Sequence, residues 1–514
     1  MTDAAGNALI AKSAPWRTLI PSWPLMVAIA TFLKAIADRA ALLNDADTYL
    51  HIAAGRWMLI HHVLPASDPF SNSMPGAPWV VHEWLSEIAL ALAYGGFGWS
   101  GIVLLTAGAF ALTLALLTRW LLVRMEPIAA LILVALSAAM LEPHLLARPH
   151  WLAAPALLAW SAAVVAARDR SRAPPFALLP LMTVWANLHG GFITGIAVAL
   201  FFGAEAVVEA PPPRRLAVAR AWGGFTALAV LAAAVTPNGL GGLALPLRLV
   251  GMSAVAAHIG EWQALDFAEF QTFELWLLLL IGSGFSLGLK LPLSRLLLIV
   301  LLTHLGLTHS RHVDLAALLG PLAVAAPLGP QLAAHFAADP DSPLRRWFRD
   351  RALPAGWPAR GATFAVLLAI AALCFARPII REDHVETPAS AVAAAQQMQL
   401  RGPVFNSYAF GGFLIFRGIA PFIDGRAEVY GDDFLGQFSA AIAGNERVLE
   451  GIIEHYAIGW TLLSPGDGAT RVLDGMPGWR RVYADDWAVI HVRAAAPASW
   501  APTGGGGCRA TQHN

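Results

Sequence analysis

The chain has 514 residues, of which 57% are hydrophobic and 13% charged, and its mean hydropathy is +0.58. Since roughly a quarter of the residues of a soluble domain are charged, this composition excludes a soluble multidomain enzyme. The 34 basic and 34 acidic residues cancel, so no net positive field attracts nucleic acid to the whole protein. The sequence predicts a polytopic membrane protein.

Apolar windows long enough to cross a hydrocarbon core of about 30 Å recur along the chain. The expected spans are 23–43, 99–121, 127–146, 150–167, 174–187, 189–209, 218–237, 273–289, 291–309, 312–328 and 361–379. A further apolar stretch, 80–97, is ambiguous because it contains His82, Glu83 and Glu87. The expected fold class is therefore mainly α, with about eleven transmembrane helices.

The chain changes character after the last span. Short β-like runs at 404–405, 413–416, 460–463 and 488–492 alternate with Gly, Pro and Asp turns, which predicts a small α/β soluble domain. Residues 422–426 look like a strand that ends in a polar turn. The expected organisation is a cytoplasmic segment 1–22, a transmembrane core 23–328 with an exoplasmic loop 44–98, a cytoplasmic loop 329–360, a last span 361–379, the α/β domain 385–496 and a disordered tail 497–514.

Basic clusters determine the expected topology, because short cytoplasmic loops are rich in Lys and Arg. With the N-terminus inside and 80–97 lying on the outer surface, every cluster falls inside: Arg119/Arg124, Arg168/Arg170/Arg172, Arg214/Arg215/Arg220, Lys290/Arg295 and Arg345/Arg346/Arg349/Arg351. If 80–97 crossed the membrane, most of them would face outward. The C-terminal domain is therefore expected on the outer, periplasmic side of a bacterial inner membrane.

The first span is followed by a D-x-D-x-Y-x-H block at 45–51, by G-R-W at 55–57 and by H-E-W at 82–84. Two carboxylates at the mouth of a hydrophobic helix are costly unless they are paired or used. A structural alternative is an N-cap for a helix over 47–62. A divalent metal is another alternative, since Asp45, Asp47, His51, His82 and Glu83 are suitable ligand types, although they lack the spacing of a zinc site.

Together with N-L-H-G-G-F at 187–192 and F-I-D-G-R at 422–426, this block resembles the GT-C glycosyltransferases and a set of bacterial GT-C-like membrane proteins. The likeness covers nearly the whole chain, from 23 to 493. It implies a membrane glycosyltransferase with a polyprenyl-phosphate-linked sugar as donor and a glycan, lipid or protein as acceptor. It also implies a loop aspartate as the base or electrostatic partner of the acceptor; Asp45 matches that position best, with Asp47 second.

An inverting transfer needs a carboxylate to accept the acceptor's proton and cations to hold the departing phosphate. The residues expected to bind donor phosphate or substrate are His51, His82, Glu83, Arg148, His150, His189, Arg311, His312, Glu261, Trp262, Asp424 and Arg426. The cationic members are alternatively interfacial side chains. Glu261 with Trp262 is a candidate sugar-stacking site, and Asp424 with Arg426 is either a structural pair or a sugar contact.

Two rival functions remain from the sequence, a lipid-linked glycan transporter and a repeat-unit polymerase. A transporter is expected to carry its polar residues at mid-membrane depth, often in broken helices. Here they cluster toward one face, which favours the enzyme. The sequence predicts membrane lipid as a partner, no nucleic acid and no cofactor.

Overall fold

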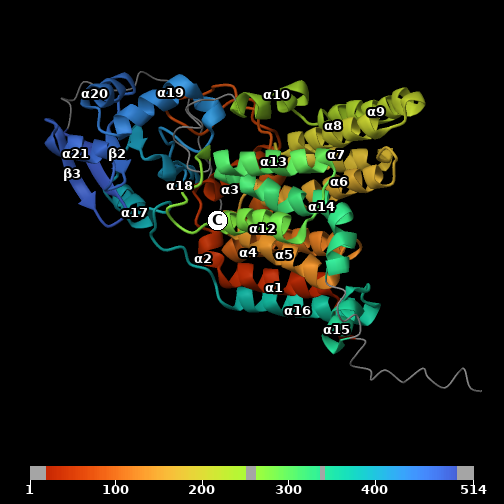
Figure 1. Ribbon diagram of the computed structural model, residues 1–514. Coiled ribbons are helices and arrows are strands. Elements are labelled where there is room, and N and C mark those ends of the chain that lie inside the picture. Colours follow the sequence, from red (N-terminus) through yellow and green to blue (C-terminus); the bar gives the residue numbers. More distant parts are fainter. Residues whose placement is uncertain (1–18, 251–261, 336–341, 495–514) are drawn as a thin grey trace, which may run out of the picture. The chain divides into compact units, whose positions relative to one another are not determined.

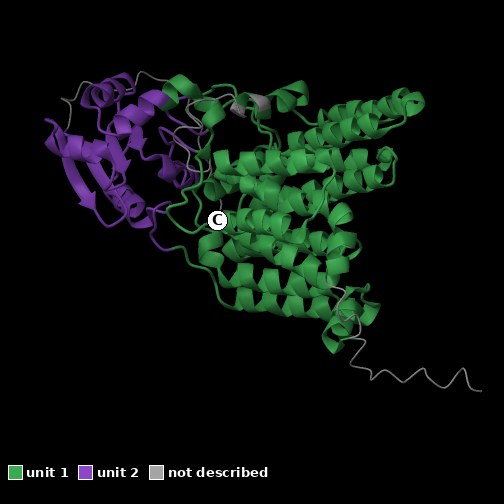
Figure 2. Ribbon diagram, in the orientation of Figure 1, with its two compact units in different colours: residues 1–69, 75–381, 425–435 green, residues 70–74, 382–424, 436–514 purple. Residues whose placement is uncertain are grey.

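The computed structural model of the protein describes residues 19–250, 262–335 and 342–494. The chain divides into two compact units (Figure 2). The first comprises residues 1–69, 75–381 and 425–435, and the second residues 70–74, 382–424 and 436–514. The tail expected at 497–514, most of the segment 1–22 and Glu261 lie outside the described residues.

The first unit is helical, and its long helices lie side by side in Figure 1. Among the described residues, seven helices are long and apolar enough to cross a membrane, and their cores are α4 (Trp84–Leu122), α5 (Pro127–Leu141), α6 (Pro149–Asp169), α8 (Phe192–Glu209), α9 (Arg215–Ala233), α14 (Val313–His335) and α16 (Trp357–Ala376). Four shorter apolar helices are α1 (Trp23–Ala37), α7 (Leu179–Leu188), α12 (Thr272–Leu287) and α13 (Leu293–Thr308). The seven and the four correspond one to one with the expected spans. The mainly α, multi-pass fold is confirmed, while the number of helices that cross the bilayer stays a prediction.

Shorter elements connect these helices. They are α2 (Arg39–Leu42), α3 (Ala46–His61), α10 (Gly239–Val250), α15 (Pro343–Ala352) and the 3-10 turns η2 (Glu142–His144), η3 (Phe176–Leu178), η4 (Pro212–Arg214) and η6 (Ser310–His312). The helix expected over 47–62 is α3, and Asp45 is its N-cap. The structural alternative for Asp45 is therefore correct, and it leaves a chemical role open.

Helix α4 is bent at Gly98, whose φ of 58° and ψ of −149° are non-helical. This backbone region is open almost only to glycine. The bend separates a helical segment, 84–97, from the span that follows. The two parts approach closely, since a Cβ on Gly101 would lie 2.2 Å from the carbonyl oxygen of Ala93. The ambiguous stretch at 80–97 is thus a distinct segment; its place at the membrane surface stays a prediction.

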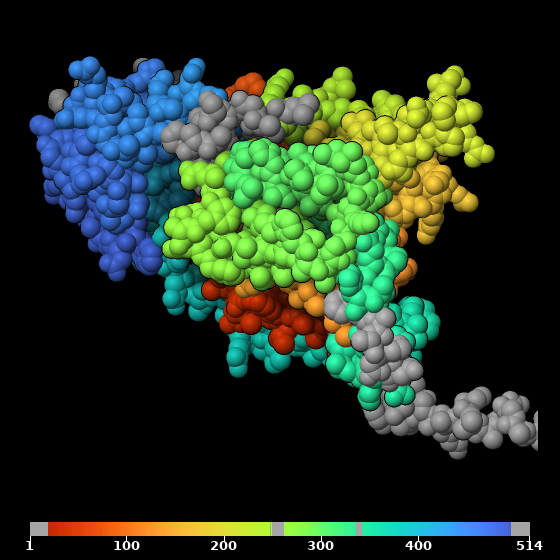
Figure 3. Space-filling view, in the orientation of Figure 1, coloured from red at the N-terminus to blue at the C-terminus, as the bar shows by residue number. Residues whose placement is uncertain are grey.

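The interior of the first unit is packed with large apolar side chains, among them Trp151, Trp160, Trp185, Phe225 and Phe273. Large apolar side chains also lie on the surface of this unit. Figure 3 shows the face on which α12 and α13 present their side chains outward. Phe285 on α12 is 90% exposed, and several leucines of both helices are exposed as well. An apolar exterior of this kind is expected of helices that face lipid.

The second unit contains a four-stranded sheet of order β1-β2-β4-β3. Its strands are β1 (Val404–Asn406), β2 (Trp460–Leu463), β3 (Trp479–Ala484) and β4 (Val489–Arg493). The β1–β2 pair is parallel and the other two pairs are antiparallel. The helices are α17 (Ala389–Gln397), α18 (Gly411–Phe416), α20 (Glu446–His455) and α21 (Gly468–Gly475), with the 3-10 turn η7 (Tyr408–Phe410); α19 (Ala427–Ile442) begins within the first unit. The predicted small C-terminal α/β fold is confirmed.

Two strand predictions are wrong. Residues 413–416 form part of α18, because a short apolar run has no period that distinguishes strand from helix and Gly411 lets the helix lie against the backbone of Ile423. Residues 422–426 form no strand. There the side chain of Asn406 accepts from the N–H of Phe422 and donates to the carbonyl of Ile423, at 2.7 and 2.9 Å, and so replaces a strand partner.

Candidate active site

Asp45 lies at the start of α3 with both carboxylate oxygens engaged. One oxygen accepts from the backbone N–H and the hydroxyl of Thr48, at 2.9 and 3.0 Å. The other accepts from Nε and Nη2 of Arg148, at 2.8 and 2.5 Å. Burial by itself raises the pKa of Asp45, but the charge and hydrogen bonds of Arg148 lower it below its ordinary value. Asp45 is therefore an ionised anchor for Arg148.

Asp47 follows in the first turn of α3 and is more accessible. Its side chain is 27% exposed, against 2% for Asp45, and its Oδ2 lies 3.2 Å from Nη2 of Arg148. The backbone of the F-I-D-G-R block passes directly beside it, since a Cβ on Gly425 would lie 2.0 Å from Oδ1 of Asp47. Only glycine permits this approach. Two blocks that are far apart in the sequence thus meet at one carboxylate.

A second group of charges surrounds Glu83, which immediately precedes α4. Its carboxylate lies 3.3 Å from Nε2 of His189, 3.5 Å from Nε2 of His82 and 3.9 Å from Nδ1 of His51. Burial alone raises the pKa of Glu83, but the neighbouring histidines and Arg148 lower it below its ordinary value. Glu83 therefore carries a negative charge among three imidazoles.

His51 lies one helical turn after Asp47, with Nδ1 at 3.3 Å from Oε1 of Glu87. Burial works against protonation, yet the hydrogen bond to Glu87 and the charges of Glu83, Glu87 and Asp47 raise the pKa of His51 to about 9. His51 is therefore a largely buried cation at neutral pH, held beside Glu83 and Glu87.

His189, in contrast to His51, is a neutral imidazole at neutral pH. Its Nδ1 accepts a 2.9 Å hydrogen bond from the backbone N–H of Gly191, so the ring proton sits on Nε2, which faces Glu83. The pKa of His189 is lowered to about 4, mainly because the ring is removed from water and also because positive charges such as Arg311 lie nearby. The G-G that follows His189 builds the turn that makes this hydrogen bond.

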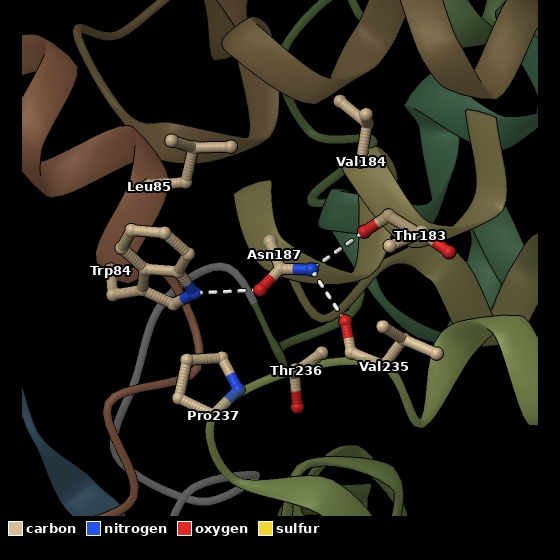
Figure 4. A pocket seen from close by; sticks show the side chains of 8 residues that line it. All are labelled: Trp84, Leu85, Thr183, Val184, Asn187, Val235, Thr236 and Pro237. Atoms are coloured by element: carbon tan, nitrogen blue, oxygen red, sulfur yellow. Dashed lines mark hydrogen bonds between the residues drawn. The ribbon is translucent and has the colours of Figure 1, made fainter. Parts of the chain in front are cut away.

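Asn187 fixes the end of α7 that carries His189. Its amide accepts from Nε1 of Trp84 at 2.7 Å and donates to the carbonyls of Thr183 and Val235 (Figure 4). These contacts border a pocket of about 460 Å³ lined mostly by apolar side chains of α4, α7 and the segment after α9. The N-L-H-G-G-F block is thus a structural support at Asn187 and a site residue at His189.

The remaining Arg and His residues of the prediction lie at the start of α6 and in the 3-10 turn η6. Arg148 precedes α6, and the ring of His150, in its first turn, lies 6.1 Å from that of His189. Arg311 lies in η6 with its guanidinium 4.6 Å from the ring of Trp262. The ring of His312 is 6.2 Å from the same tryptophan. Among the expected residues, the structure therefore brings together Asp45, Asp47, His51, His82, Glu83, Arg148, His150 and His189, with Arg311, His312 and Trp262 as an adjoining cluster.

The two predicted residues of the F-I-D-G-R block, Asp424 and Arg426, belong to different compact units. Asp424 is fully buried and belongs to the second unit. Arg426 belongs to the first unit, where its Nη1 donates to Oδ1 of Asp68 at 2.7 Å and its guanidinium lies 4.6 Å from the ring of Trp79. Both members of the Arg426–Asp68 ion pair are buried, so Arg426 has a clear structural contact.

Four residues at or near the site were not predicted as site residues: Asp68, Trp79, Glu87 and Glu428. Nε1 of Trp79 lies 3.3 Å from Oε1 of Glu428, and burial raises the pKa of Glu428. Glu87 was visible in the sequence as a second acid on the helix of Glu83, and Glu428 as an acid two residues after Arg426. Within the described residues, no group of three or more His, Cys, Asp or Glu side chains has an arrangement that would hold a metal ion.

No family model matches the sequence, and no curated protein matches it. Solved structures similar to this chain include the oligosaccharyltransferase AglB of the archaeon Archaeoglobus fulgidus, in complex with an inhibitory peptide and a dolichol-phosphate. The identity is 14%, the TM-score 0.49, and the match covers 86% of this chain and 69% of that one. Another is ArnT from Cupriavidus metallidurans bound to undecaprenyl phosphate, with 16% identity, a TM-score of 0.47 and coverage of 92% and 98%.

Proposed function

We propose that the protein is a GT-C type glycosyltransferase of the bacterial inner membrane. It would transfer a sugar from a polyprenyl-phosphate-linked donor to a glycan, lipid or protein acceptor on the outer, periplasmic side. The observation that carries this proposal is the pair Asp45 and Asp47 around Arg148, at the end of the helix bundle where His189 and Arg311 also lie. An accessible carboxylate beside guanidinium groups suits acceptor deprotonation next to a leaving phosphate.

The geometry favours Asp47 rather than Asp45 as the base, which reverses the order that the resemblance implies. Asp45 is buried and accepts four hydrogen bonds, so protonating it would break its contacts with Arg148 and Thr48. Asp47 has the greater exposure of the two. We assign Asp45 the role of positioning Arg148.

The proposed reaction is a single inverting displacement. The acceptor's hydroxyl oxygen attacks the anomeric carbon while its proton passes to the carboxylate of Asp47. The bond from that carbon to the phosphate oxygen breaks, and the polyprenyl phosphate leaves with the electron pair. Arg148 and Arg311 would bind the phosphate, since guanidinium groups match its oxygens in bidentate geometry. Cationic His51, ionised Glu83 and the carboxyl group of Glu87 would hold the loop between α3 and α4 in register.

A transfer assay tests this proposal. Purified protein in nanodiscs is incubated with a panel of undecaprenyl-phosphate-linked sugars and with membranes from cells that lack the protein. Mass spectrometry should detect undecaprenyl phosphate and a glycosylated acceptor in equal amounts. Asp47→Asn should reduce the rate by about 10²–10⁴. Asp350→Asn is the matched control, because Asp350 is exposed on α15.

The assay distinguishes the alternatives. If Asp45→Asn is inactive and Asp47→Asn is active, Asp45 is the base. If both variants retain full activity, the carboxylate mechanism is wrong. If liposomes that contain the protein move a lipid-linked glycan without altering it covalently, the protein is a transporter.

A further inference from the structure

The G-R-W block at 55–57 lies in α3 after Asp47 and His51, and the proposed reaction does not use it. Gly55 explains one part of the block. A Cβ at this position would lie 2.0 Å from the carbonyl oxygen of Glu87 and 2.7 Å from Cβ of Ala91. The backbones of α3 and α4 therefore touch at Gly55, as small residues allow at close helix crossings.

Beyond this contact the two helices leave a groove of about 600 Å³. It is lined by Arg56, Leu59 and Ile60 from α3 and by Ala91, Leu92, Gly95 and Gly96 from α4. A Cβ on Gly95 or Gly96 would meet no atom within 4 Å, so the floor of the groove is open space. Its volume is in the range of sites that bind small molecules, and its walls are apolar except for Arg56.

The groove borders the apolar surface of the first unit. Phe97, next to Gly96, packs on Phe375 in the last turn of the apolar helix α16, with ring centroids 5.3 Å apart. Ile60 and Leu92 on its two rims are 73% and 58% exposed. Large apolar side chains exposed at the end of a membrane helix are expected where hydrocarbon meets headgroups.

Arg56 gives the groove its charge. Its guanidinium lies 4.8 Å from the ring centroid of Tyr94, and an aromatic ring with a cation is typical of the membrane interface. None of the lining residues is acidic. A guanidinium above an apolar channel complements a phosphate that carries an acyl chain.

We propose that this groove binds an anionic glycerophospholipid. One acyl chain lies over Ala91, Gly95 and Gly96, and the headgroup phosphate contacts Arg56. The site does not depend on the proposed function. Because α3 carries Asp47 and His51 while α4 follows Glu83 and carries Glu87, a lipid that bridges the two helices would also stabilise the loop that carries the site.

Lipid binding can be measured without any enzymatic activity. Protein in detergent is titrated with phosphatidylglycerol and, separately, with phosphatidylcholine, and the rise in melting temperature and the bound lipid in native mass spectra are recorded. Phosphatidylglycerol should stabilise the wild type more. Arg56→Gln should weaken its binding about tenfold, as expected for loss of a charged hydrogen bond, and Gly96→Leu should fill the groove and abolish the difference between the two lipids.

Two controls match these variants. Arg377 is exposed after the end of α16, so Arg377→Gln removes a comparable charge. Gly282 on α12 also has open space at its Cβ, so Gly282→Leu adds the same side chain elsewhere. Equal phosphatidylglycerol binding in the wild type, Arg56→Gln and Gly96→Leu would overturn the proposal, and so would undecaprenyl phosphate binding that Gly96→Leu abolishes. If Gly96→Leu does not fold, Arg56→Gln alone decides.

Discussion

The two ends of the helix bundle each hold a cluster of charges, and the clusters differ in how they are satisfied. At the end of α6 and α8 and the start of α13, Arg295 contacts Asp169 at 3.0 Å, Glu205 at 3.1 Å and the carbonyl of Ala323 at 3.0 Å. Arg168 pairs with Glu205 and Glu209 in the same network. Arg295 and Glu205 are buried. We call this group the closed cluster, because its central charges are buried and paired with one another.

At the opposite end of α6, Asp47, His82 and His189 keep part of their side chains exposed. There the pKa of His51 is raised and that of His189 lowered, which is typical of functional sites. The difference teaches that a charge cluster in a membrane protein indicates chemistry when it is accessible and has mixed protonation states. A buried and mutually paired cluster indicates assembly.

The largest expected effect concerns the side of the membrane on which the C-terminal region lies, because labelling of Cys508 is then either present or absent in intact cells. Cys374 is buried, so Cys508 alone should report on the C-terminal region. A membrane-impermeant maleimide should label intact, outer-membrane-permeabilised cells, and Cys508→Ser should remove the label. Labelling that occurs only after lysis would place the C-terminal region in the cytoplasm and contradict the proposed outer site.

The next largest effect is on stability at the closed cluster. Arg295→Met leaves Glu205 buried without its main partner and should lower the free energy of unfolding by about 3–5 kcal/mol. The transfer rate per folded molecule should stay unchanged. Denaturation in detergent measures the first quantity, and Arg295→Met/Glu205→Gln should recover part of the loss. A variant with full stability but no transfer would show that this cluster belongs to the function.

A smaller effect is expected on donor binding at the open cluster. Arg311→Ala should weaken the binding of undecaprenyl phosphate by about 1.5–3 kcal/mol, and Arg311→Lys by less, since Lys keeps the charge but loses the bidentate geometry. The readout is the rise in melting temperature on adding undecaprenyl phosphate, with Arg377→Ala as control. An equal rise in the wild type and Arg311→Ala would remove Arg311 from the phosphate site; a drop in the ligand-free melting temperature would indicate a structural pair instead.

A further effect is a pH dependence of stability at His51. Its pKa is raised from 6.5 to about 9 in the folded protein, so its stabilising contribution is fully present below pH 6.5 and is lost as the pH rises through about 9. The melting temperature of His51→Gln should therefore fall below that of the wild type at pH 6 and approach it above pH 9. His61→Gln serves as control, because His61 is exposed at the end of the same helix. A constant difference between the wild type and His51→Gln at every pH would contradict a cationic His51.

The sequence predicted the helices well, because each span is a long apolar run and Asp45 caps α3 through a contact with Thr48 only three residues away. The meeting of Gly425 with Asp47 and of Arg426 with Asp68 joins residues more than 350 positions apart, and no local pattern encodes it. The same holds for Glu428, whose pKa depends on burial by distant residues. The preference for Asp45 over Asp47 as the base stays a prediction; it rests on motif position, which carries no information about accessibility.

The bend at Gly98 has a consequence for how one helix serves two solvents. A straight α4 of 39 residues would be about 58 Å long, nearly twice the thickness of a hydrocarbon core of about 30 Å. The bend divides α4 into a long apolar helix that begins after Gly98 and a segment, 84–97, that follows Glu83 and carries Glu87. A single glycine thus sets the direction in which the segment that carries these acids leaves the apolar helix.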